Sequence, residues 1–438
     1  MLKAVKEFAY QFLEETQNKP IKVISHNDTD GITSASIITM ALQRLDKEFS
    51  LTIVKQLEES TIKELPKDHV ILFVDLASNS FNYLKEIKNK VFILDHHEII
   101  SEIPKNITIV NPHLFNEEEI SGAGLAYLFS KELSEENTDL AYLAIIGMVG
   151  DQMDKNIGKI YNQILKDAGI EVKKGITLYP ATRPLNKILE YNSDIFIPEV
   201  TGSSEGAARF LREIGIGTIN GRYKNIIELN EEETSKLITA ITVHRTDKGS
   251  TEDLIGNIFL VNFFNRLEDA RQVSAMINSC SRLGESAIAI SFCLQKRSSK
   301  EKVDSIYTKY RQNIVKALNS WPGLKKIEKE NYVIINAEDK IKDTLIGTIA
   351  SIISNSKQYS HGKAIIAMAY NEDKIKVSAR MVGKSGRNIR ELLNSVIEIV
   401  GGEVGGHHAA AGALLQKDKE QEFIEELKKK LEIELVKI

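Results

Sequence analysis

Short apolar runs alternate with longer amphipathic stretches between residues 21 and 111. The runs IKVIS, LTIVKQ, HVILFVD, VFILD and ITIVNP are typical of strands, whereas GITSASIITMALQRL and SFNYLKEIKNK have the spacing of helices. Strands that alternate with helices indicate a parallel α/β sheet. The first residues, MLKAVKEFAYQFLEE, mix acids with apolar residues and predict an amphipathic helix rather than a signal peptide.

Helical patterning dominates the middle of the chain. SGAGLAYLFSKEL and LAYLAIIGMVGD predict two helices, and Ser121 is a plausible N-cap of the first. From roughly 155 to 320 the pattern is mostly helical, and it closes with a long charged helix, KRSSKEKVDSIYTKYRQNIVKAL, before a boundary near WPGL. We interpret this region as a helical connector or insertion.

Strand patterning returns toward the C-terminus. NYVIINAE, KAIIAMAY and KIKVSARM predict strands, and helices are expected at about 342–355, through NIRELLNSVIEI and at about 418–431. The expected fold class is α/β, with an N-terminal parallel-sheet domain (1–195), a helical middle region (196–322) and a smaller C-terminal α/β domain (323–438).

The composition narrows the class of protein. Of the 438 residues, 42% are hydrophobic and 27% charged, which is typical of a soluble globular protein. The most apolar later run, LIGNIFLVNFF at 254–264, is too short to span a bilayer, so we expect a cytoplasmic protein with no membrane partner. Cys280 and Cys293 cannot form a disulfide framework. The net charge of −4 means that any polyanion must be held locally, by a basic patch or by metal ions.

Residues that commonly bind metals follow the predicted strands. In SHNDTDG, an extended backbone projects His26, Asp28 and Asp30 to one side. Asp75 ends ILFVD, Asp95 and His96 end VFILDHH, and Asp151 follows the apolar helix GMVG. Taken singly, each aspartate has the alternative role of a helix N-cap or Asx turn, and paired histidines are often surface residues. The first three sites, however, all lie where a strand ends and a helix follows. Open α/β sheets bind ligands at these carboxyl ends of their strands.

The mixture of carboxylates and imidazoles favours manganese, cobalt or zinc over magnesium alone, and Mn²⁺ is the first choice. Four aspartates carry four negative charges, which two divalent ions balance: Asp28, Asp30, Asp75 and Asp151. Two close ions can stabilise the attacking and leaving oxygens of a phosphodiester. The chemistry that this predicts is phosphoryl hydrolysis, with Mg²⁺ or Co²⁺ as substitute ions.

The ordered segments HNDTDG, VDLAS, LDHHE and GMVGDQ resemble the four motifs of the DHH phosphoesterase superfamily. The resemblance implies a two-metal site in which Asp75 bridges the ions. It assigns His26 and Asp28 to one ion, and to the other it assigns Asp30, His96 and Asp151. His97 would assist the substrate phosphate or a proton transfer, and His97 and Asp95 are the predicted catalytic residues. The resemblance also favours Asp151 over the nearby Asp154.

A second candidate site lies near the C-terminus. GGEVGGHHAAAGA at 401–413 could let backbone approach a ligand or present peptide N–H groups at a helix start, and the alternative is a tight loop before a close-packed segment. KIKVSARM alternates, so that one strand face carries Lys374, Lys376, Ser378 and Arg380. With the three cations that follow, this face forms the strongest basic patch, unless it is simply a solvated strand face: Lys384, Arg387 and Arg390.

GGH followed by AAG resembles the substrate-binding motif of the DHHA1 domain, which accompanies DHH domains in one branch of the superfamily. This implies a grip on a nucleotide or phosphate by Arg380, Ser378, Gly405, Gly406 and His407. Type II inorganic pyrophosphatases share the metal motifs but carry a different C-terminal domain. The order of the parts resembles RecJ-type single-strand exonucleases, and RLEDARQVSAMINSCSRLGE at 266–285 is similar to archaeal RecJ-like nucleases.

The function expected from these resemblances is that of a Mn²⁺-dependent exonuclease acting on single-stranded DNA or RNA, in replication, repair or RNA turnover. One alternative is a phosphodiesterase of short oligonucleotides or cyclic dinucleotides. Another is a replisome scaffold, because archaeal RecJ-like proteins associate with the GINS complex.

Overall fold

The computed structural model describes residues 1–99, 101–115, 117–170, 172–178, 180–191, 197–244, 254–355, 358–383 and 386–432. The chain forms two compact units. The first comprises Met1–Ile188, Leu211–Thr239 and Ser250–Tyr307, and the second comprises Leu189–Phe210, Ala240–Gly249 and Thr308–Ile438.

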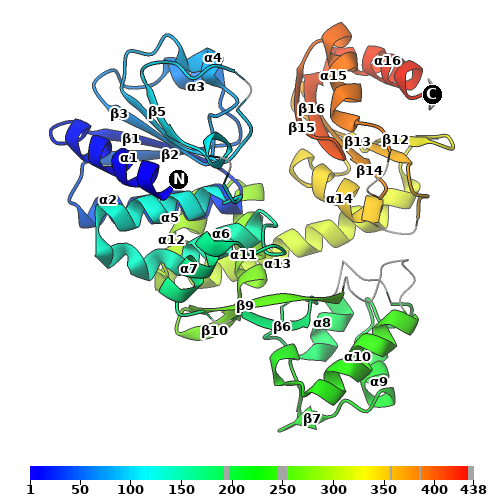
Figure 1. Ribbon diagram of the computed structural model, residues 1–438. Coiled ribbons are helices and arrows are strands. Elements are labelled where there is room, and N and C mark those ends of the chain that lie inside the picture. Colours follow the sequence, from blue (N-terminus) through cyan, green and yellow to red (C-terminus); the bar gives the residue numbers. More distant parts are fainter. Residues whose placement is uncertain are drawn as a thin grey trace. The chain divides into compact units, whose positions relative to one another are not determined.

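The first unit is built on a five-stranded parallel sheet with the strand order β2-β1-β3-β4-β5, as the alternating pattern predicts (Figure 1). The strands are β1 (Ile21–His26), β2 (Phe49–Val54), β3 (Val70–Val74), β4 (Val91–Leu94) and β5 (Ile107–Val110). β3 and β4 are buried along their whole length, which explains why VILFV and VFIL are continuously apolar.

Helices cover both faces of this sheet (Figure 1). One face packs against α1 (Leu2–Glu15), α2 (Thr29–Arg44) and α5 (Gly122–Leu133), and α6 (Ala141–Gly150) packs on α2 and α5. The other packs against α3 (Glu59–Lys63) and α4 (Phe81–Leu84). The helix expected over SFNYLKEIKNK is only the four-residue α4. Near the end of this segment, Asn89 donates hydrogen bonds to the backbone carbonyls of Pro66 and His69.

The middle region is mostly helical, as expected. Its helices are α7 (Lys159–Asp167), α8 (Leu185–Tyr191), α9 (Ser204–Glu213), α10 (Glu231–His244), α11 (Ala270–Arg282), α12 (Ser286–Cys293) and α13 (Arg297–Ser320). Short 3₁₀ turns occur here and elsewhere, at Pro112–Leu114, Glu135–Leu140, Ile226–Glu228, Trp321–Gly323 and Lys417–Lys419.

The middle region also contains strands that the helical pattern did not predict. An antiparallel sheet of order β10-β9-β6 joins β6 (Val172–Ile176), β9 (Ile255–Phe263) and β10 (Arg266–Asp269), and β7 (Thr218–Ile219) pairs with β8 (Arg222–Tyr223). The apolar run at 254–264 is therefore a strand. Its residues Phe259, Val261 and Phe263 enter the main core at the two-residue spacing of a strand.

The second unit contains a six-stranded sheet of order β11-β12-β13-β14-β16-β15 (Figure 1). Its strands are β11 (Lys326–Glu328), β12 (Tyr332–Asn336), β13 (Ala364–Asn371), β14 (Lys374–Met381), β15 (Glu403–His407) and β16 (Ala410–Gln416). α15 (Ile389–Val400) and α16 (Glu420–Glu432) pack on one face, whereas α14 (Asp343–Asn355) lies against β13 and β14. This confirms the predicted smaller α/β domain.

The glycine-rich segment at 401–413 is not at a helix start, so that expectation was wrong. It forms the hairpin of β15 and β16, in which Gly405 pairs with Gly412 and His407 with Ala410. Gly406 has φ of +120°, and a Cβ there would lie 2.5 Å from the carbonyl oxygen of Ala410. Glycine is therefore required by the strand pairing itself. Within the described ranges, no helix is long and apolar enough to cross a membrane.

Candidate active site

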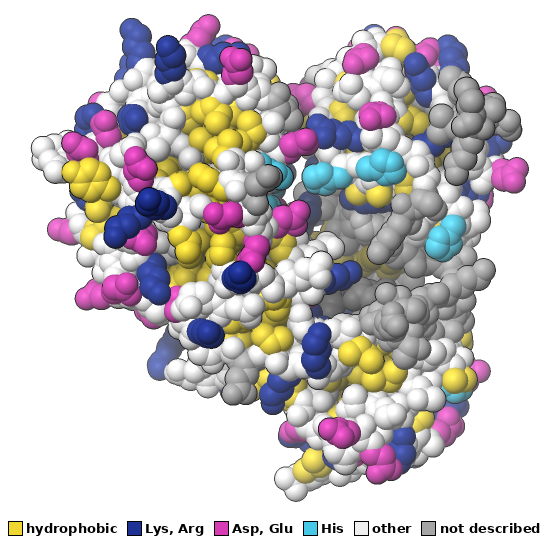
Figure 2. All heavy atoms as spheres, viewed as in Figure 1, with side chains coloured by type: hydrophobic (Ala, Val, Ile, Leu, Met, Phe, Trp, Pro, Cys, Tyr) yellow, Lys and Arg dark blue, Asp and Glu magenta, His cyan; other side chains and the backbone are white. Residues whose placement is uncertain are grey.

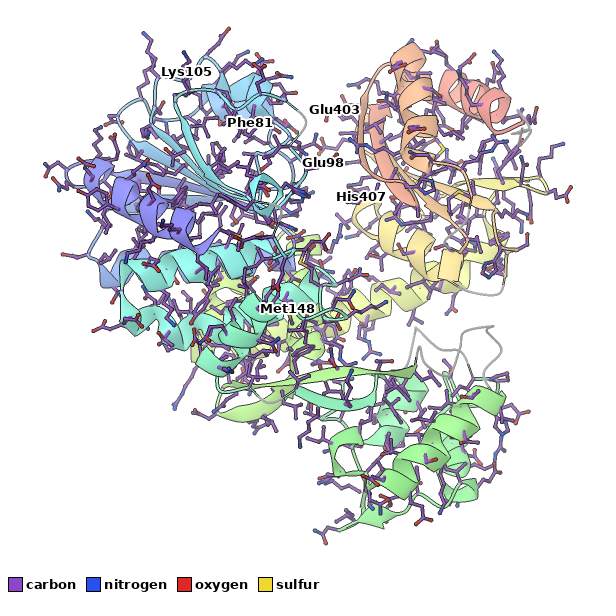
Figure 3. The ribbon with its side chains drawn as sticks, in the orientation of Figure 1. Phe81, Glu98, Lys105, Met148, Glu403 and His407 are labelled. Carbon is purple, nitrogen blue, oxygen red and sulfur yellow. The ribbon has the colours of Figure 1, made fainter. Side chains whose placement is uncertain are left out.

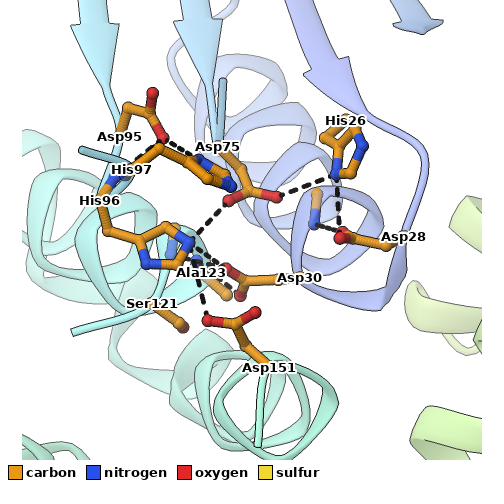
Figure 4. Close-up of polar contacts among 12 residues, drawn as sticks. His26, Asp28, Asp30, Asp75, Asp95, His96, His97, Ser121, Ala123 and Asp151 are labelled. Carbon is orange, nitrogen blue, oxygen red and sulfur yellow. Dashed lines mark hydrogen bonds and ion pairs between the residues drawn. The ribbon is translucent and has the colours of Figure 1, made fainter. Parts of the chain in front are cut away.

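The predicted metal ligands gather at the carboxyl ends of β1, β3 and β4 (Figure 4). His26 ends β1, and Asp28 is the N-cap of α2, where its Oδ1 accepts a hydrogen bond from the Gly31 amide at 2.9 Å. Asp30 lies in the first turn of α2. A Cβ on residue 31 would lie 2.2 Å from the carbonyl oxygen of His26, so only glycine allows this tight turn from strand to helix.

Asp75 lies at the centre of the cluster. It follows β3 with φ of +60°, and its side chain is 1% exposed. Neither carboxylate oxygen accepts a hydrogen bond from any residue that the structure describes. The Nε2 of His96 lies 3.2 Å from Oδ1, and the Nδ1 of His26 lies 3.8 Å from Oδ2. A buried carboxylate without hydrogen-bond donors is strongly disfavoured unless a cation compensates it.

In the part of the chain that the structure describes, three groups of side chains have ligand atoms within 4.8 Å of one another. His26, Asp28 and Asp75 form the first group. Asp30, His96 and Asp151 form the second, and Asp75, His96 and His97 form the third. All six predicted metal ligands belong to these groups, and Asp154 belongs to none of them. Such clusters of carboxylates and imidazoles are suited to a divalent metal ion.

Hydrogen bonds orient the ligands. The Nε2 of His26 lies 3.2 Å from the carbonyl oxygen of Lys55, which leaves Nδ1 to face Asp28 and Asp75. Asp30 accepts hydrogen bonds from the Gly122 and Ala123 amides, at 2.6 and 3.0 Å, at the N-terminus of α5. The positive end of the α5 dipole therefore stabilises the Asp30 carboxylate.

Asp95 is fully buried and lies beside the two histidines (Figure 4). Its Oδ2 accepts a hydrogen bond from the Ser78 amide at 2.8 Å, and its Oδ1 accepts one from the His96 amide at 2.8 Å. The Nδ1 of His97 lies 2.7 Å from the same Oδ1. Asp95 lies in none of the ligand groups found among the described residues, and its contacts fit a residue that orients His97.

The carboxylates raise one another's pKa. Burial, and then the charge of Asp30, raises the pKa of Asp75 well above its usual range. Burial, Asp30 and Asp28 likewise raise the pKa of Asp151 to about 8. Burial alone would lower the pKa of His97, but its hydrogen bond to Asp95 raises that pKa to about 9. Divalent cations would relieve the repulsion that causes the shifts of the two aspartates.

Several residues that shape the site were not singled out from the sequence. A Cβ on Gly122 would lie 2.6 Å from Oδ1 of Asp75, and one on Gly147 would lie 2.6 Å from Oδ1 of Asp30, so both glycines make room for carboxylates. Asn111 follows β5 and donates to Ser78. In the sequence, two features could have pointed to these residues. They are the small residues of SGAG, which include Gly122, and the position of Asn111 directly after a predicted strand.

The C-terminal candidate residues lie on adjacent strands of the second unit. Arg380 of β14 pairs with Ala410 of β16, which pairs with His407 of β15, so the three share one row across the sheet. Ser378, Gly412 and Gly405 form the neighbouring row on the same face. The two glycines leave bare backbone beside the row that carries Arg380 and His407.

These residues differ in how accessible they are. His407 is exposed, and Figure 3 shows it on the edge strand β15 with Glu403 at the other end. Arg380 is half-buried beneath α14, where its Nε donates to Ser351 Oγ at 2.9 Å and one terminal nitrogen donates to the Ala379 carbonyl at 2.8 Å. Ser378 is 5% exposed and also lies under α14, close to Gly347.

The cations of the predicted basic patch differ in their surroundings. Arg387 donates to the Lys430 carbonyl at 2.8 Å, Arg390 is exposed, and Lys384 lies outside the described residues. In the view of Figure 2, cations and acids are interspersed, and histidines are visible on the C-terminal part of the chain.

A parallel α/β sheet whose strand ends gather carboxylates and imidazoles defines a class of metal-binding hydrolases. Matches to family models show which family within this class the chain belongs to. The DHH family, N-terminal domain, matches residues 20–148, the DHH-CID domain matches 179–259 and the DHHA1 domain matches 330–432. The chain belongs to the DHH family of phosphodiesterase hydrolases and has a RecJ-like arrangement of DHH and DHHA1 domains.

Two relatives illustrate the range of similarity. An uncharacterised protein of Methanocaldococcus jannaschii is 31% identical over 424 residues, which cover 92% of this chain and 91% of that protein. The single-stranded-DNA-specific exonuclease RecJ of Bacillus subtilis is 30% identical over 168 residues. That match covers 34% of this chain and only 21% of the exonuclease.

Solved structures share the fold. RecJ of Thermus thermophilus in complex with Mn²⁺ has a TM-score of 0.62 at 18% identity, and the match covers 98% of this chain and 54% of that one. CDC45 of Entamoeba histolytica has a TM-score of 0.69 at 13% identity, and the match covers 98% of this chain and 99% of that one.

Proposed function

We propose that this protein is a Mn²⁺-dependent exonuclease that hydrolyses single-stranded DNA or RNA. Asp75 carries the proposal, because its buried carboxylate, without hydrogen-bond donors in the described structure, lies between two groups of ligands. Asp75 would bridge two ions, with His26 and Asp28 holding one and Asp30, His96 and Asp151 holding the other. The ions would stabilise the attacking and leaving oxygens of the phosphodiester.

Manganese is the proposed ion because imidazole nitrogens accompany the carboxylates, and magnesium prefers oxygen ligands. The similar Thermus thermophilus RecJ structure contains Mn²⁺, which supports this choice, and Mg²⁺ or Co²⁺ would be substitutes. His97 is placed beside Asp75 and His96, so it can donate a hydrogen bond or a proton to the phosphate group.

The C-terminal unit would hold the substrate. Arg380 and His407 share a sheet row, and Ser378 with Gly405 forms the next row. Because α14 covers Ser378 and part of Arg380, a phosphate or nucleotide would lie at the exposed β15 end of these rows, beside Gly405 and His407. Gly406 sets the hairpin geometry that presents His407. A single-stranded polymer is the proposed substrate because the Bacillus subtilis relative is specific for single-stranded DNA.

A replisome scaffold is the second candidate, with the GINS complex as its partner. The fold likeness to CDC45 of Entamoeba histolytica favours it. The complete set of metal ligands favours catalysis, because a purely structural role would not require four converging carboxylates.

The test is a time course of degradation with Mn²⁺, using single-stranded DNA and RNA labelled at either end, beside blunt duplex. The native protein should release nucleotides from single strands, and Asp75→Asn should abolish the activity. Asp154→Asn is the matched control, because this nearby acid lies outside the ligand groups, and it should retain activity.

Intact polymers after incubation with the native protein would refute the exonuclease. Short oligonucleotides and cyclic dinucleotides would then be tested as substrates, and GINS binding would be measured by pull-down. Equal cleavage of duplex and single strand would refute the single-strand preference.

A further inference from the structure

Asn111 occupies a buried position where three strand ends meet. It follows β5, and its side chain is fully buried. Its Nδ2 donates to Ser78 Oγ and to the His97 carbonyl oxygen, both at 2.9 Å, while its Oδ1 accepts from the His113 amide at 3.0 Å. The amide therefore ties the end of β5 to the loops that follow β3 and β4.

Both groups that accept a hydrogen bond from Asn111 Nδ2 are close to the contact between Asp95 and His97. Ser78 donates its amide to Oδ2 of Asp95, and Asp95 Oδ1 is 2.7 Å from Nδ1 of His97. A carboxylate only accepts hydrogen bonds, so Nδ1 must carry the proton and Nε2 is left to face the metal-ligand groups. Asn111 thus restrains this pair from both sides.

The loop that Asn111 restrains is strained. Asp75 and Ala77 have φ of +60° and +95°, values that residues with a Cβ adopt at a cost. Such a conformation persists only where surrounding contacts fix it. The hydrogen bond from Asn111 to Ser78 is one contact that does so.

We propose that Asn111 is a positioning residue that fixes the His97 imidazole, with Nδ1 on Asp95 and Nε2 toward the metal-ligand groups. The catalytic part of this inference rests on the proposed phosphodiesterase function. In the described structure, the hydrogen bonds of Asn111 go to a hydroxyl and to backbone groups, not to a metal-ligand side chain. Its loss should therefore lower kcat more than it changes metal binding or KM.

Asn89 provides a matched control in the same sheet. It precedes β4, is 7% exposed, and donates from Nδ2 to the carbonyl oxygens of Pro66 and His69 at 2.9 and 2.8 Å. Asn89→Ala removes the same kind of double donor at the opposite end of the strands. Both alanine variants should lose similar thermal stability, which separates stability from positioning.

The expected result is a loss of kcat of about tenfold or more in Asn111→Ala, as for other residues that orient ligands. KM for single-stranded DNA and the Mn²⁺ affinity measured by calorimetry should stay within about twofold. In Asn89→Ala, kcat should stay near the native value. Ser78→Ala, which removes only the hydroxyl that accepts from Asn111, should lower kcat in the same direction and is a milder change if Asn111→Ala does not fold.

A second readout does not depend on activity. In metal-free protein labelled with ¹⁵N-histidine, the Nδ1–H proton of His97 should give a downfield, exchange-protected NMR signal, identified by its absence in His97→Gln. The signal should persist in Asn89→Ala and vanish or broaden in Asn111→Ala. If it persists in both variants and their kcat values agree, the inference is overturned.

Failure of the proposed function would look different. The native protein would then cleave no phosphodiester substrate with Mn²⁺, whereas the NMR signal would still report whether Asn111 fixes His97.

Discussion

The pKa of Asp151 is raised by burial and by the carboxylates that are crowded together around it. It ends α6, its side chain is 30% exposed, and burial together with Asp30 and Asp28 raises its pKa from the usual 3.8 to about 8. The metal-free folded protein therefore holds a proton at Asp151 that the unfolded chain releases at much lower pH. This difference links the stability of the metal-free protein to pH.

The predicted sign follows from the raised pKa of an acid. Asp151 contributes stability that is fully present below pH 3.8, falls as the pH rises, and is gone above about pH 8. In chelator, the Tm of the native protein should fall relative to that of Asp151→Asn across this range. Thermal unfolding at intervals of one pH unit measures it. Parallel Tm curves for the two proteins would contradict the pKa assigned to Asp151.

At the scale of elements, α11 connects the middle region to the metal-ligand site. It packs on α2 and α6, and its Ser274 carbonyl accepts a hydrogen bond from the Thr29 hydroxyl at 3.1 Å. Asp269, fully buried, caps α11 and pairs with Arg271 at 2.7 Å. Arg271 also donates to the Thr177 carbonyl at 2.9 Å. The pair thus fixes the helix behind Asp28 and Asp30.

Arg271→Ala would leave the Asp269 carboxylate buried without its cation. The expected cost is about 3–5 kcal/mol of unfolding free energy, because breaking one side of a buried ion pair leaves an uncompensated charge. Urea denaturation measures it. Lys63→Ala, which breaks the exposed pair with Glu59, is the control and should leave the urea midpoint unchanged. Equal midpoints for the two variants would show that the Asp269 pair does not stabilise the fold.

At the scale of the whole molecule, metal binding should act on folding. The ligands come from β1, β3, β4, α2 and α6, so they are assembled only in the folded state. Mn²⁺ at a hundred times its Kd should stabilise the native protein by about 2.7 kcal/mol per site and raise its Tm, and chelator should reverse the effect. Asp75→Asn should respond much less. A native Tm that does not change with Mn²⁺ would argue against the site.

Much of the fold was predictable from local patterns. The strands β1 to β5 and β12 to β14, and the long helix α13, follow from runs whose periodicity depends on near neighbours alone. The gathering of the candidate ligands was also predictable, because each of the first three candidate segments directly follows or ends a strand, and the carboxyl ends of parallel strands meet at one edge.

Other features depend on contacts distant in sequence. The strand β9 was missed because its apolar run suits a helix or a strand, and its partners β6 and β10 decided between them. The 401–413 segment became a hairpin because β16 pairs with β14 as well as β15. Local glycine patterns cannot reveal such pairing.

By itself, the sequence determined which residue types stand at the strand ends, and hence the metal chemistry that we propose for the site. Only the tertiary structure decided which groups surround those residues. The hydrogen bonds of Asn111 with Ser78 and His97 span 33 and 14 residues, and those of Asp30 with α5 span more than 90. Strand order and helix packing create these contacts, because they bring together segments that lie far apart in the sequence.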